Sequence, residues 1–244
     1  MKSILLTNDD GVNADGLKSI LFELRHIANV LVVAPDQNRS AVSHGLSVHT
    51  HFKLEETGSD CFSLNGTPAE CVIYALDKLF VEPPDLVISG INHGANLGDH
   101  IMYSGTVAAA REAARYGMPA IAISQDFENG KKIRFKEGTE FVLEIVKAML
   151  DNGLNGELLL NINIPVGKVR GMKITRQGYS KHQKHFTAPS DERHPFDSQR
   201  DMLISDRLAI LEGYVSITPL ERDQTDYVSA RLLAEAAKQL YKMP

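Results

Sequence analysis

The apolar run near the start of the chain, Ile4 to Leu6, constrains the fold more than any other feature. It is too short for a helix and is bounded by polar residues, which is typical of a central parallel strand buried on both faces. Asn8, Asp9 and Asp10 follow it directly. In open α/β sheets ligands bind at the carboxyl ends of the strands, because the strand-to-helix loops diverge there. The two aspartates therefore occupy a position where a site is expected.

Adjacent carboxylates at this position need a physical explanation. Two negative charges roughly 4 Å apart repel by about 4 kcal/mol at an effective dielectric constant of about 20. Such a pair holds a cation, shares a proton or stays well solvated. The alternative to a site is a solvated turn in which an aspartate caps the next helix. We favour a cation site at Asp9 and Asp10 over that alternative.

Strand and helix patterns alternate through the first two thirds of the chain. An amphipathic pattern predicts a helix over 15–28, with Asn13 or Asp15 as its cap, before a strand over 30–34 that ends at Pro35. Similar patterns predict strands over 61–64, 86–89, 120–124 and 158–161, a half-exposed strand over 46–53, and helices after Thr67, over 104–116 and over 139–150. This order predicts a doubly wound, Rossmann-like α/β fold with a mostly parallel sheet.

Two of the predicted helix starts carry capping signals. Thr67, Pro68 and Glu70 form a capping box, and a structural role alone explains them. Ser104 and Thr106 open an alanine-rich helix, and either can cap it. Exposed amides at a helix start also make a ready anion site. Both interpretations of the second helix start remain open at this point.

The C-terminal part of the chain has a different character. We expect one α/β domain over 1–244, with a Rossmann-like core over 1–165 and a β/α extension over 166–244. Patterns in the extension predict strands over 169–175, 208–211 and 214–217 and a terminal helix over 227–241 capped by Asp226. The segment 177–201 is polar. It is interpreted as an arm exchanged with another subunit, a lid over an acidic site, or a long surface loop.

Charge and cysteine content limit the functional classes. The formal net charge of -5 argues against a broad nucleic-acid surface, which needs clustered Lys and Arg. Cys61 and Cys71 are too few for a disulfide framework and lack metal-ligand spacing, so reduced thiols are expected. No signal-peptide pattern or bilayer-spanning apolar run is visible. The expectation is a soluble cytoplasmic protein without a membrane partner or a stable nucleic-acid partner.

More oxygen donors fall at the predicted sheet edge that carries the two aspartates. They are Ser40, Asn92 and Asn96, with the helix start at Ser104, Gly105 and Thr106 beside them. Hard oxygen ligands without Cys or clustered His select Mg²⁺, Mn²⁺ or Ca²⁺. Bare aspartates repel a phosphate, whereas a divalent cation would bridge the two and helix amides would hold the remaining charge. The pattern predicts metal-assisted hydrolysis of a phosphoryl group.

Other kinds of phosphate site do not fit the sequence. A P-loop needs a Gly-Lys-Ser/Thr ending and a dinucleotide site needs G-x-G-x-x-G after the first strand, and both are missing. A haloacid-dehalogenase-type phosphatase would need a second aspartate where Gly11 and Val12 stand. A receiver domain would need a phospho-accepting aspartate and a late lysine at the strand ends where Ser89 and Gln125 stand.

Several motifs in one order resemble the SurE family of stationary-phase survival proteins. They are Thr7-Asn8-Asp9-Asp10-Gly11, Ala34-Pro35-Asp36 with Arg39-Ser40, Asn65-Gly66-Thr67-Pro68, Ser89-Gly90-Ile91-Asn92-His93-Gly94 and Tyr103-Ser104-Gly105-Thr106. The resemblance is strong over 1–125 and looser beyond. It implies a metal-dependent nucleoside monophosphate phosphatase that acts on 5′- and 3′-nucleotides and sometimes on short polyphosphate.

The resemblance also implies roles for single residues. The metal ligands would be Asp9, Asp10, Ser40 and Asn92, around one Mg²⁺ or Mn²⁺ per subunit, with Ca²⁺ able to replace it in crystals. The phosphate contacts would be Asn96, Ser104, Gly105 and Thr106. Family members are expected to form homodimers or homotetramers through an exchanged C-terminal arm, which would give the polar segment its purpose.

The mechanism hypothesis is in-line attack of a metal-activated water on the phosphate, with Asp9 or Asp10 accepting the proton. Which acid does so stays open. His44 is a candidate for protonating the leaving oxygen, although we favour a loop histidine with an ordinary hydrogen bond. The alternative function is a non-catalytic module that senses a nucleotide or phosphate through the same metal.

Overall fold

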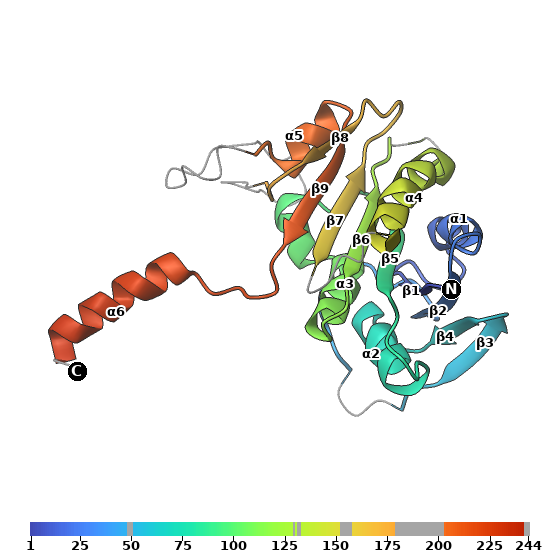
Figure 1. The fold of residues 1–244 in the computed structure, drawn as a ribbon, viewed down its shortest axis with the longest axis horizontal. Helices are drawn as coiled ribbons and strands as arrows, with labels where there is room; N and C mark the ends of the chain where they lie inside the picture. The colour runs from blue at the N-terminus through green and yellow to red at the C-terminus, as the bar shows by residue number, and fades with distance from the viewer. Residues whose placement is uncertain (48–50, 129, 131–132, 152–157, 179–202, 242–244) are drawn as a thin grey trace.

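The computed structural model describes residues 1–244 except 48–50, 129, 131–132, 152–157, 179–202 and 242–244 (Figure 1). Its strands are β1 (Ser3–Thr7), β2 (Asn29–Pro35), β3 (Leu54–Gly58), β4 (Cys61–Leu64), β5 (Leu86–His93), β6 (Ala120–Gln125), β7 (Leu159–Ile164), β8 (Met172–Ile174) and β9 (Val215–Leu220). Its helices are α1 (Asp15–Leu24), α2 (Pro68–Lys78), a 3₁₀ helix η1 (Gly98–Met102), α3 (Gly105–Arg115), α4 (Phe135–Asp151), α5 (Asp206–Leu211) and α6 (Tyr227–Tyr241).

The strands form one nine-stranded sheet in the order β3-β4-β2-β1-β5-β6-β7-β9-β8. From β4 to β7 all neighbouring strands are parallel, which confirms the predicted doubly wound core. In this core Leu5 of β1 pairs with Leu31 on one side and with Val87 on the other. After β1 the chain adds β2 on one side of it and later adds β5 on its other side, so the direction of the strand order reverses between β1 and β5. In open α/β sheets such a switch point is where ligands bind.

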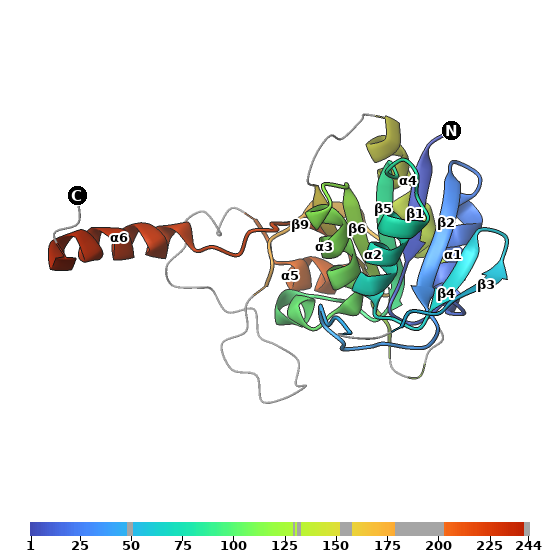
Figure 2. The same cartoon turned by 90° about the horizontal axis from the view of Figure 1, so that it is seen from below.

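The first strand is buried on both faces, as its apolar run predicts. Ile4 and Leu6 pack in the cluster that includes the buried residues of α1 and α4. Leu5 packs in the opposite cluster, with the buried residues of α2 and α3. Figure 2 shows α2 and α3 side by side over one face of the sheet. Because β1 is packed on both faces, its carboxyl end holds the residues after Thr7 in a fixed position.

Several element boundaries differ from the sequence-based expectation. Helix α1 has Ala14 as its N-cap residue, without a capping side chain, so the assignment of Asn13 or Asp15 as the cap is wrong. Helix α4 begins at Phe135, earlier than the predicted 139. The strand predicted over 46–53 is not found in its described part, and the exposed strand β3 lies at Leu54–Gly58 instead.

The extension adds two strands to the far edge of the sheet. Strand β9 pairs antiparallel with β7, and the short strand β8 pairs parallel with β9. The strand expected over 208–211 is wrong, because these residues belong to helix α5. Ser205 Oγ accepts a hydrogen bond from Leu208 N at 3.2 Å and caps this helix. A short apolar run does not by itself distinguish a strand from a buried helix.

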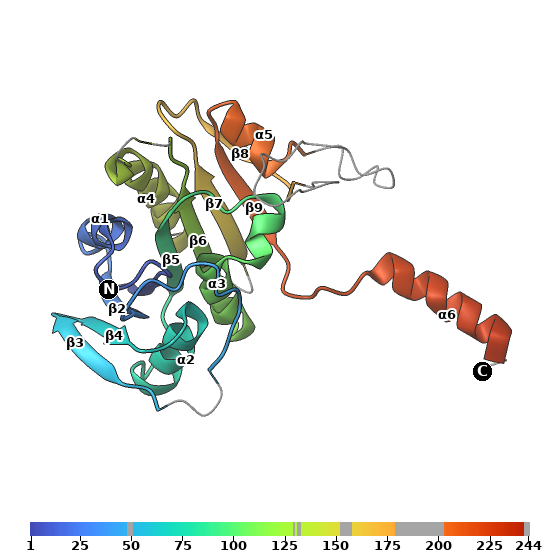
Figure 3. The same cartoon turned by 180° about the vertical axis from the view of Figure 1, so that it is seen from behind.

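The terminal helix α6 is present as predicted. Asp226 Oδ1 accepts hydrogen bonds from Val228 N and Ser229 N, each at 3.0 Å, and so caps it. The helix stands away from the sheet in all three views (Figures 1–3). The predicted polar arm over 177–201 lies outside the described residues except at its start. No helix in the described ranges is both long and apolar enough to cross a bilayer.

Candidate metal and phosphate site

The loop after β1 is shaped by Asn8. Its side-chain amide donates to Gly11 O at 2.9 Å, and its Oδ1 accepts from Gly11 N at 3.2 Å. Gly11 has a φ of +100°, in the region that favours glycine. These two bonds close a tight turn that presents Asp9 and Asp10 at the sheet edge. Asn8 itself is fully buried, so its role is structural.

Asp9 is a buried carboxylate, with only 4% of its surface exposed. Its Oδ1 accepts a hydrogen bond from the Thr106 hydroxyl at 2.5 Å, and its backbone carbonyl accepts from Arg39 N at 2.7 Å. Burial raises the pKa of Asp9 to about 6, against the hydrogen bonds from Thr106 that lower it, and the charge of Asp10 raises it further. The residue is thus held by the loop after β2 and by the first turn of α3.

Asp10 points toward the neighbouring loops. Its Oδ1 accepts from Asn38 Nδ2 at 3.3 Å, and its Oδ2 accepts from His93 N at 3.0 Å. Burial raises the pKa of the Asp10 carboxyl, although the His93 amide partly offsets the effect. Burial thus disfavours the charged forms of two adjacent carboxylates. A cation bound between them would favour the charged forms.

The first turn of α3 lies directly against Asp9. A Cβ on Gly105 would come within 2.9 Å of Asp9 Cβ and 3.1 Å of Pro68 Cγ, so only glycine permits this approach. Ser104 caps the helix by accepting a hydrogen bond from Val107 N at 3.1 Å. The capping interpretation of Ser104 is therefore confirmed. The anion interpretation stays compatible with it, because the first-turn amides and the helix dipole still favour negative charge.

Ser40 lies in the loop after β2, which is connected to the acids through Asn38. Asn38 Oδ1 accepts from Ser40 N at 2.8 Å, while its Nδ2 donates to Asp10. The backbone just beyond is strained, since Ala41 and Ser43 have φ values of 58° and 56°. Non-glycine residues in this region cost roughly 1–2 kcal/mol each, and such strain clusters at functional sites.

Asn92 lies at the end of β5, next to the switch point. Its Nδ2 donates to Gly94 O at 2.7 Å, which leaves the amide oxygen as the atom available to a cation. The strand is irregular here, between Ser89 and Asn92. A Cβ on Gly90 would lie 2.4 Å from Ile123 O, so β5 approaches β6 more closely than a side chain would allow.

Asn96 sits in a buried hydrogen-bond network that sequence reasoning missed. Its backbone N–H donates to Asn163 Oδ1 at 2.7 Å, and its carbonyl accepts from Asn161 Nδ2 at 2.8 Å and from Asn163 Nδ2 at 3.2 Å. Its own Nδ2 donates to Ser124 Oγ at 2.8 Å. Polar residues at alternate positions of the otherwise apolar strand β7 were the available signal. The network fixes Asn96 before any ligand arrives.

Two further buried hydroxyls lie at the end of β1 and in the middle of β5. Thr7 and Ser89 are register partners, and both are fully buried. Neither hydroxyl oxygen has a hydrogen-bond partner among the described residues. A buried unsatisfied polar group costs about 1–3 kcal/mol, and such groups in native proteins are typical of functional regions. Thr7 precedes Asp9 by two residues, and Ser89 precedes Asn92 by three residues along β5.

His44 has a clear partner away from the two aspartates. Its Nε2 lies 2.7 Å from Glu112 Oε2, and Arg115 lies 2.7 Å from the other oxygen. Although burial raises the pKa of Glu112, the hydrogen bonds from His44 and Arg115 outweigh it and lower the pKa. The geometry is that of a loop histidine anchored to α3, while its role as an acid stays a prediction.

The residues present fit a hard divalent cation. In the part of the chain that the structure describes, no group of three His, Cys, Asp or Glu side chains lies close enough together to hold a metal ion without other ligands. A metal at Asp9 and Asp10 therefore needs neutral oxygen ligands, and the loops of Ser40 and Asn92 are tied to the same edge. An all-oxygen donor set of this kind suits Mg²⁺ or Mn²⁺. The individual ligand roles stay predictions.

Comparison with known proteins identifies relatives along nearly the whole chain. The family model described as "Survival protein SurE" matches residues 4–184. A protein from Syntrophotalea carbinolica named 5'-nucleotidase SurE is 37% identical, and the match covers 95% of this chain and 96% of that protein. A protein of the same name from Geobacter metallireducens is 39% identical, and the match covers 94% of this chain and 95% of that protein. The crystal structure of SurE from Aquifex aeolicus superimposes with a TM-score of 0.81 at 35% identity, over 98% of this chain and 99% of that one. With these matches and the motifs at the sheet edge, the chain belongs to the SurE family.

Proposed function

We propose that the chain is a divalent-metal-dependent phosphatase that releases phosphate from nucleoside monophosphates, as a 5′-nucleotidase does. The observation that carries this proposal is the pair of adjacent carboxylates of Asp9, which is buried against the first turn of α3, and Asp10, which is half-buried beside it. It combines two hard anionic ligands with a helix start that favours phosphate. Relatives named 5'-nucleotidase SurE, which match nearly the full chain, support the same activity.

In this proposal one Mg²⁺ or Mn²⁺ binds per subunit. The residues that would hold it are Asp9, Asp10, Ser40 and Asn92. Such a cation, when bound, neutralises phosphate charge and acidifies water. The chain contributes fixed geometry: Thr106 orients Asp9, while Asn38 and His93 orient Asp10. One of the two carboxylates would accept the proton of the attacking water, and pH–rate profiles of the two Asn variants would assign it.

The phosphate would lie at the start of α3. The contacts that we propose are Asn96, Ser104, Gly105 and Thr106. Support comes from the missing side chain of Gly105, which lets the helix amides approach Asp9, and from the network that holds Asn96. The Thr106 hydroxyl already donates to Asp9, so Thr106 would connect the phosphate end of the site to the carboxylate.

A single assay separates an enzyme from a sensor. Purified protein with Mn²⁺ or Mg²⁺ and AMP should release inorganic phosphate, and EDTA should abolish the release. A panel of 5′- and 3′-nucleotides and short polyphosphate would define the substrate range. Tight AMP binding without phosphate release would favour the sensor and refute the phosphatase.

The assembly is proposed to be a homodimer or homotetramer that exchanges C-terminal elements. The support is helix α6, whose apolar side chains are exposed although apolar surface of this kind is normally covered. They are Tyr227, Val228, Leu232 and Leu233, with between 58% and 72% of each residue exposed. Deleting 177–201 tests whether the polar arm is the exchanged element. If the sedimentation mass of this variant is unchanged, the arm does not hold the assembly together, and α6 is the element that is left to do so.

A further inference from the structure

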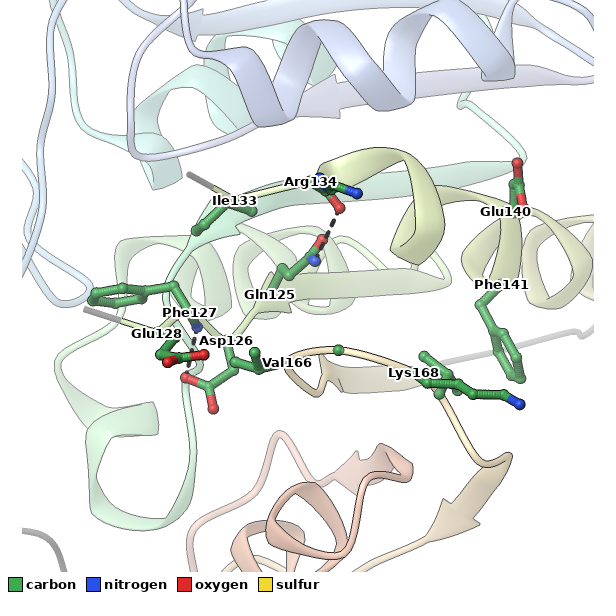
Figure 4. Close-up of a pocket in the computed structure, with 12 residues that line it drawn as sticks. Gln125, Asp126, Phe127, Glu128, Ile133, Arg134, Glu140, Phe141, Val166 and Lys168 are labelled. Carbon is green, nitrogen blue, oxygen red and sulfur yellow. Dashed lines mark hydrogen bonds between the residues drawn. The ribbon is translucent and has the colours of Figure 1, made fainter. Parts of the chain in front are cut away.

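A large cavity opens beside the proposed site, at the carboxyl ends of β6 and β7 (Figure 4). Its volume is about 1040 Å³, and Gln125, Phe127, Arg134, Phe141 and Val166 are among its lining residues. Small-molecule sites typically enclose roughly 300–1,000 Å³, so a nucleoside fits with room to spare. None of the proposed metal or phosphate residues lines this cavity.

His93 connects the cavity wall to the carboxylates by direct contacts. The backbone N–H of His93 donates to Asp10 Oδ2 at 3.0 Å, and its ring lies 4.7 Å, centroid to centroid, from the ring of Phe127. His93 is also the register partner of Gln125, at the strand spacing of about 4.8 Å. Asp10 and Phe127 therefore both contact His93, the first through its backbone and the second through its ring.

The ring of Phe127 is available to a ligand. The residue is 39% exposed, and Gly94 leaves room beside it, since a Cβ there would meet the ring at 3.4 Å. His93 is exposed as well. Figure 4 shows Phe127 at one end of the cavity and Phe141 with Lys168 at the other. Exposed, flat aromatic surface of this kind is what a heterocyclic base stacks on.

The charges that line the cavity disfavour an anionic occupant. Carboxylates and cations both line it, and the acids are not outnumbered: Asp126, Glu128 and Glu140 stand against Arg134 and Lys168. A phosphate would gain no net attraction in this cavity. It would be attracted instead to the proposed site, by the metal and by the start of α3. The uncharged end of the substrate is the part that suits the cavity.

We propose that Phe127, backed by His93, is a stacking platform for the nucleobase, and that the base enters the cavity between β6, β7 and α4. The inference rests on the proposed function and extends it to substrate recognition. A stacking platform accepts any base, because every base has a π-face. The expected enzyme is broad in base preference yet distinguishes nucleotides from phosphate esters without a base.

The test compares AMP with ribose 5-phosphate, which differ only in the base. Phe127→Ala should raise KM for AMP and lower kcat/KM by about 5- to 150-fold, the equivalent of one lost base stack of ~1–3 kcal/mol. The kinetics with ribose 5-phosphate should stay unchanged, and Phe127→Trp should restore AMP turnover. Phe22→Ala is the matched control, because Phe22 also pairs with a histidine ring, His26, but on α1.

Equal effects of Phe127→Ala on both substrates, or none on AMP, would overturn the platform. Failure of the proposed function looks different: the wild-type protein would then release phosphate from neither substrate. In that event calorimetric titration with adenosine, which carries the base but no phosphate, still decides. Weaker adenosine binding by Phe127→Ala supports the platform, and equal binding or no binding by both proteins refutes it.

Discussion

The carboxyl edge of the parallel strands buries polar side chains, whereas the terminal helix α6 leaves apolar side chains exposed. At the strand ends polar side chains are buried and tied to one another, as Asp9 is to Thr106 and Asn96 is to Asn163. On α6 apolar side chains such as Leu232 and Leu233 are exposed. The carboxyl edge of the parallel strands brings the residues of the proposed site together within one chain, whereas the apolar side chains of α6 are left without a covering surface among the described residues.

The largest expected effect is the loss of catalysis when one carboxylate of the strand edge is removed. Asp10→Asn should lower kcat for AMP by at least about 10³-fold, since the metal loses a charged ligand while the size of the side chain is kept. Phosphate release measures it. Asp85→Asn is the control, because Asp85 is an exposed carboxylate paired with Lys2. Wild-type turnover by Asp10→Asn would remove Asp10 from the site.

The second effect concerns the stability of the metal-free protein. The pKa of Asp9 is raised from 3.8 to about 6, so the ionised form is disfavoured in the fold. The stability that the fold gains from a protonated Asp9 is fully present below pH 4, and it is lost as the pH rises through the folded-state pKa of about 6. Asp9→Asn should therefore stabilise the EDTA-treated protein at pH 8 by up to about 3 kcal/mol.

Urea unfolding at pH 4 and pH 8 measures this difference. The gain from Asp9→Asn should shrink to well below ~1 kcal/mol at pH 4, where the wild-type carboxyl is protonated in the folded state and only part of the penalty for its ionisation is left. A gain of equal size at both pH values would show that burial of the Asp9 charge is not its cause.

The third effect probes the contact between α3 and Asp9. Gly105→Ala should destabilise the protein by about 1–3 kcal/mol and lower kcat, because its Cβ would press on Asp9 and Pro68. Gly58→Ala is the matched control, since its Cβ would meet only Cys61 at an ordinary 3.8 Å. Urea unfolding and phosphate release together provide the readout. Equal behaviour of the two variants would contradict the close approach of α3.

A smaller effect is expected from His44. His44→Ala should cost about 1–2 kcal/mol of unfolding free energy, because buried Glu112 loses a hydrogen-bond partner. The pH profile of kcat should keep its shape if His44 only anchors its loop. Loss of one limb of that profile would instead make His44 the acid for the leaving group.

The smallest effect on catalysis is expected at α6, where the other half of the comparison is tested. Leu232→Glu with Leu233→Glu should lower the sedimentation mass of the assembly and leave the AMP turnover per subunit nearly unchanged. Val81→Glu is the control, because Val81 is 97% exposed and lies on another part of the chain. An unchanged mass would mean that another surface makes the assembly.

Local signals in the sequence predicted the elements of the core. The run Ile4 to Leu6 predicted a strand buried on both faces, and the capping box at Thr67 is present with both of its hydrogen bonds. The same kind of reasoning failed at α5, where a short apolar run fits a helix as well as a strand.

The candidate site was predicted only in part, because much of it depends on contacts between distant residues. Ser124, Asn161 and Asn163 reach Asn96 only through strand order and register. The contact of Asn38 with Asp10 likewise joins two separate loops. No local pattern encodes such contacts. The polar positions within the buried strand β7 were a signal, but they did not identify a partner.

The most direct test of a two-carboxylate metal site is a Mn²⁺ titration of EDTA-treated protein, followed by phosphate release from AMP. The wild-type protein should regain its full rate along a saturating curve, whereas Asp10→Asn should remain inactive at Mn²⁺ concentrations that saturate the wild type. Phosphate release that persists in EDTA, or a normal titration of Asp10→Asn, would contradict the assignment of the site.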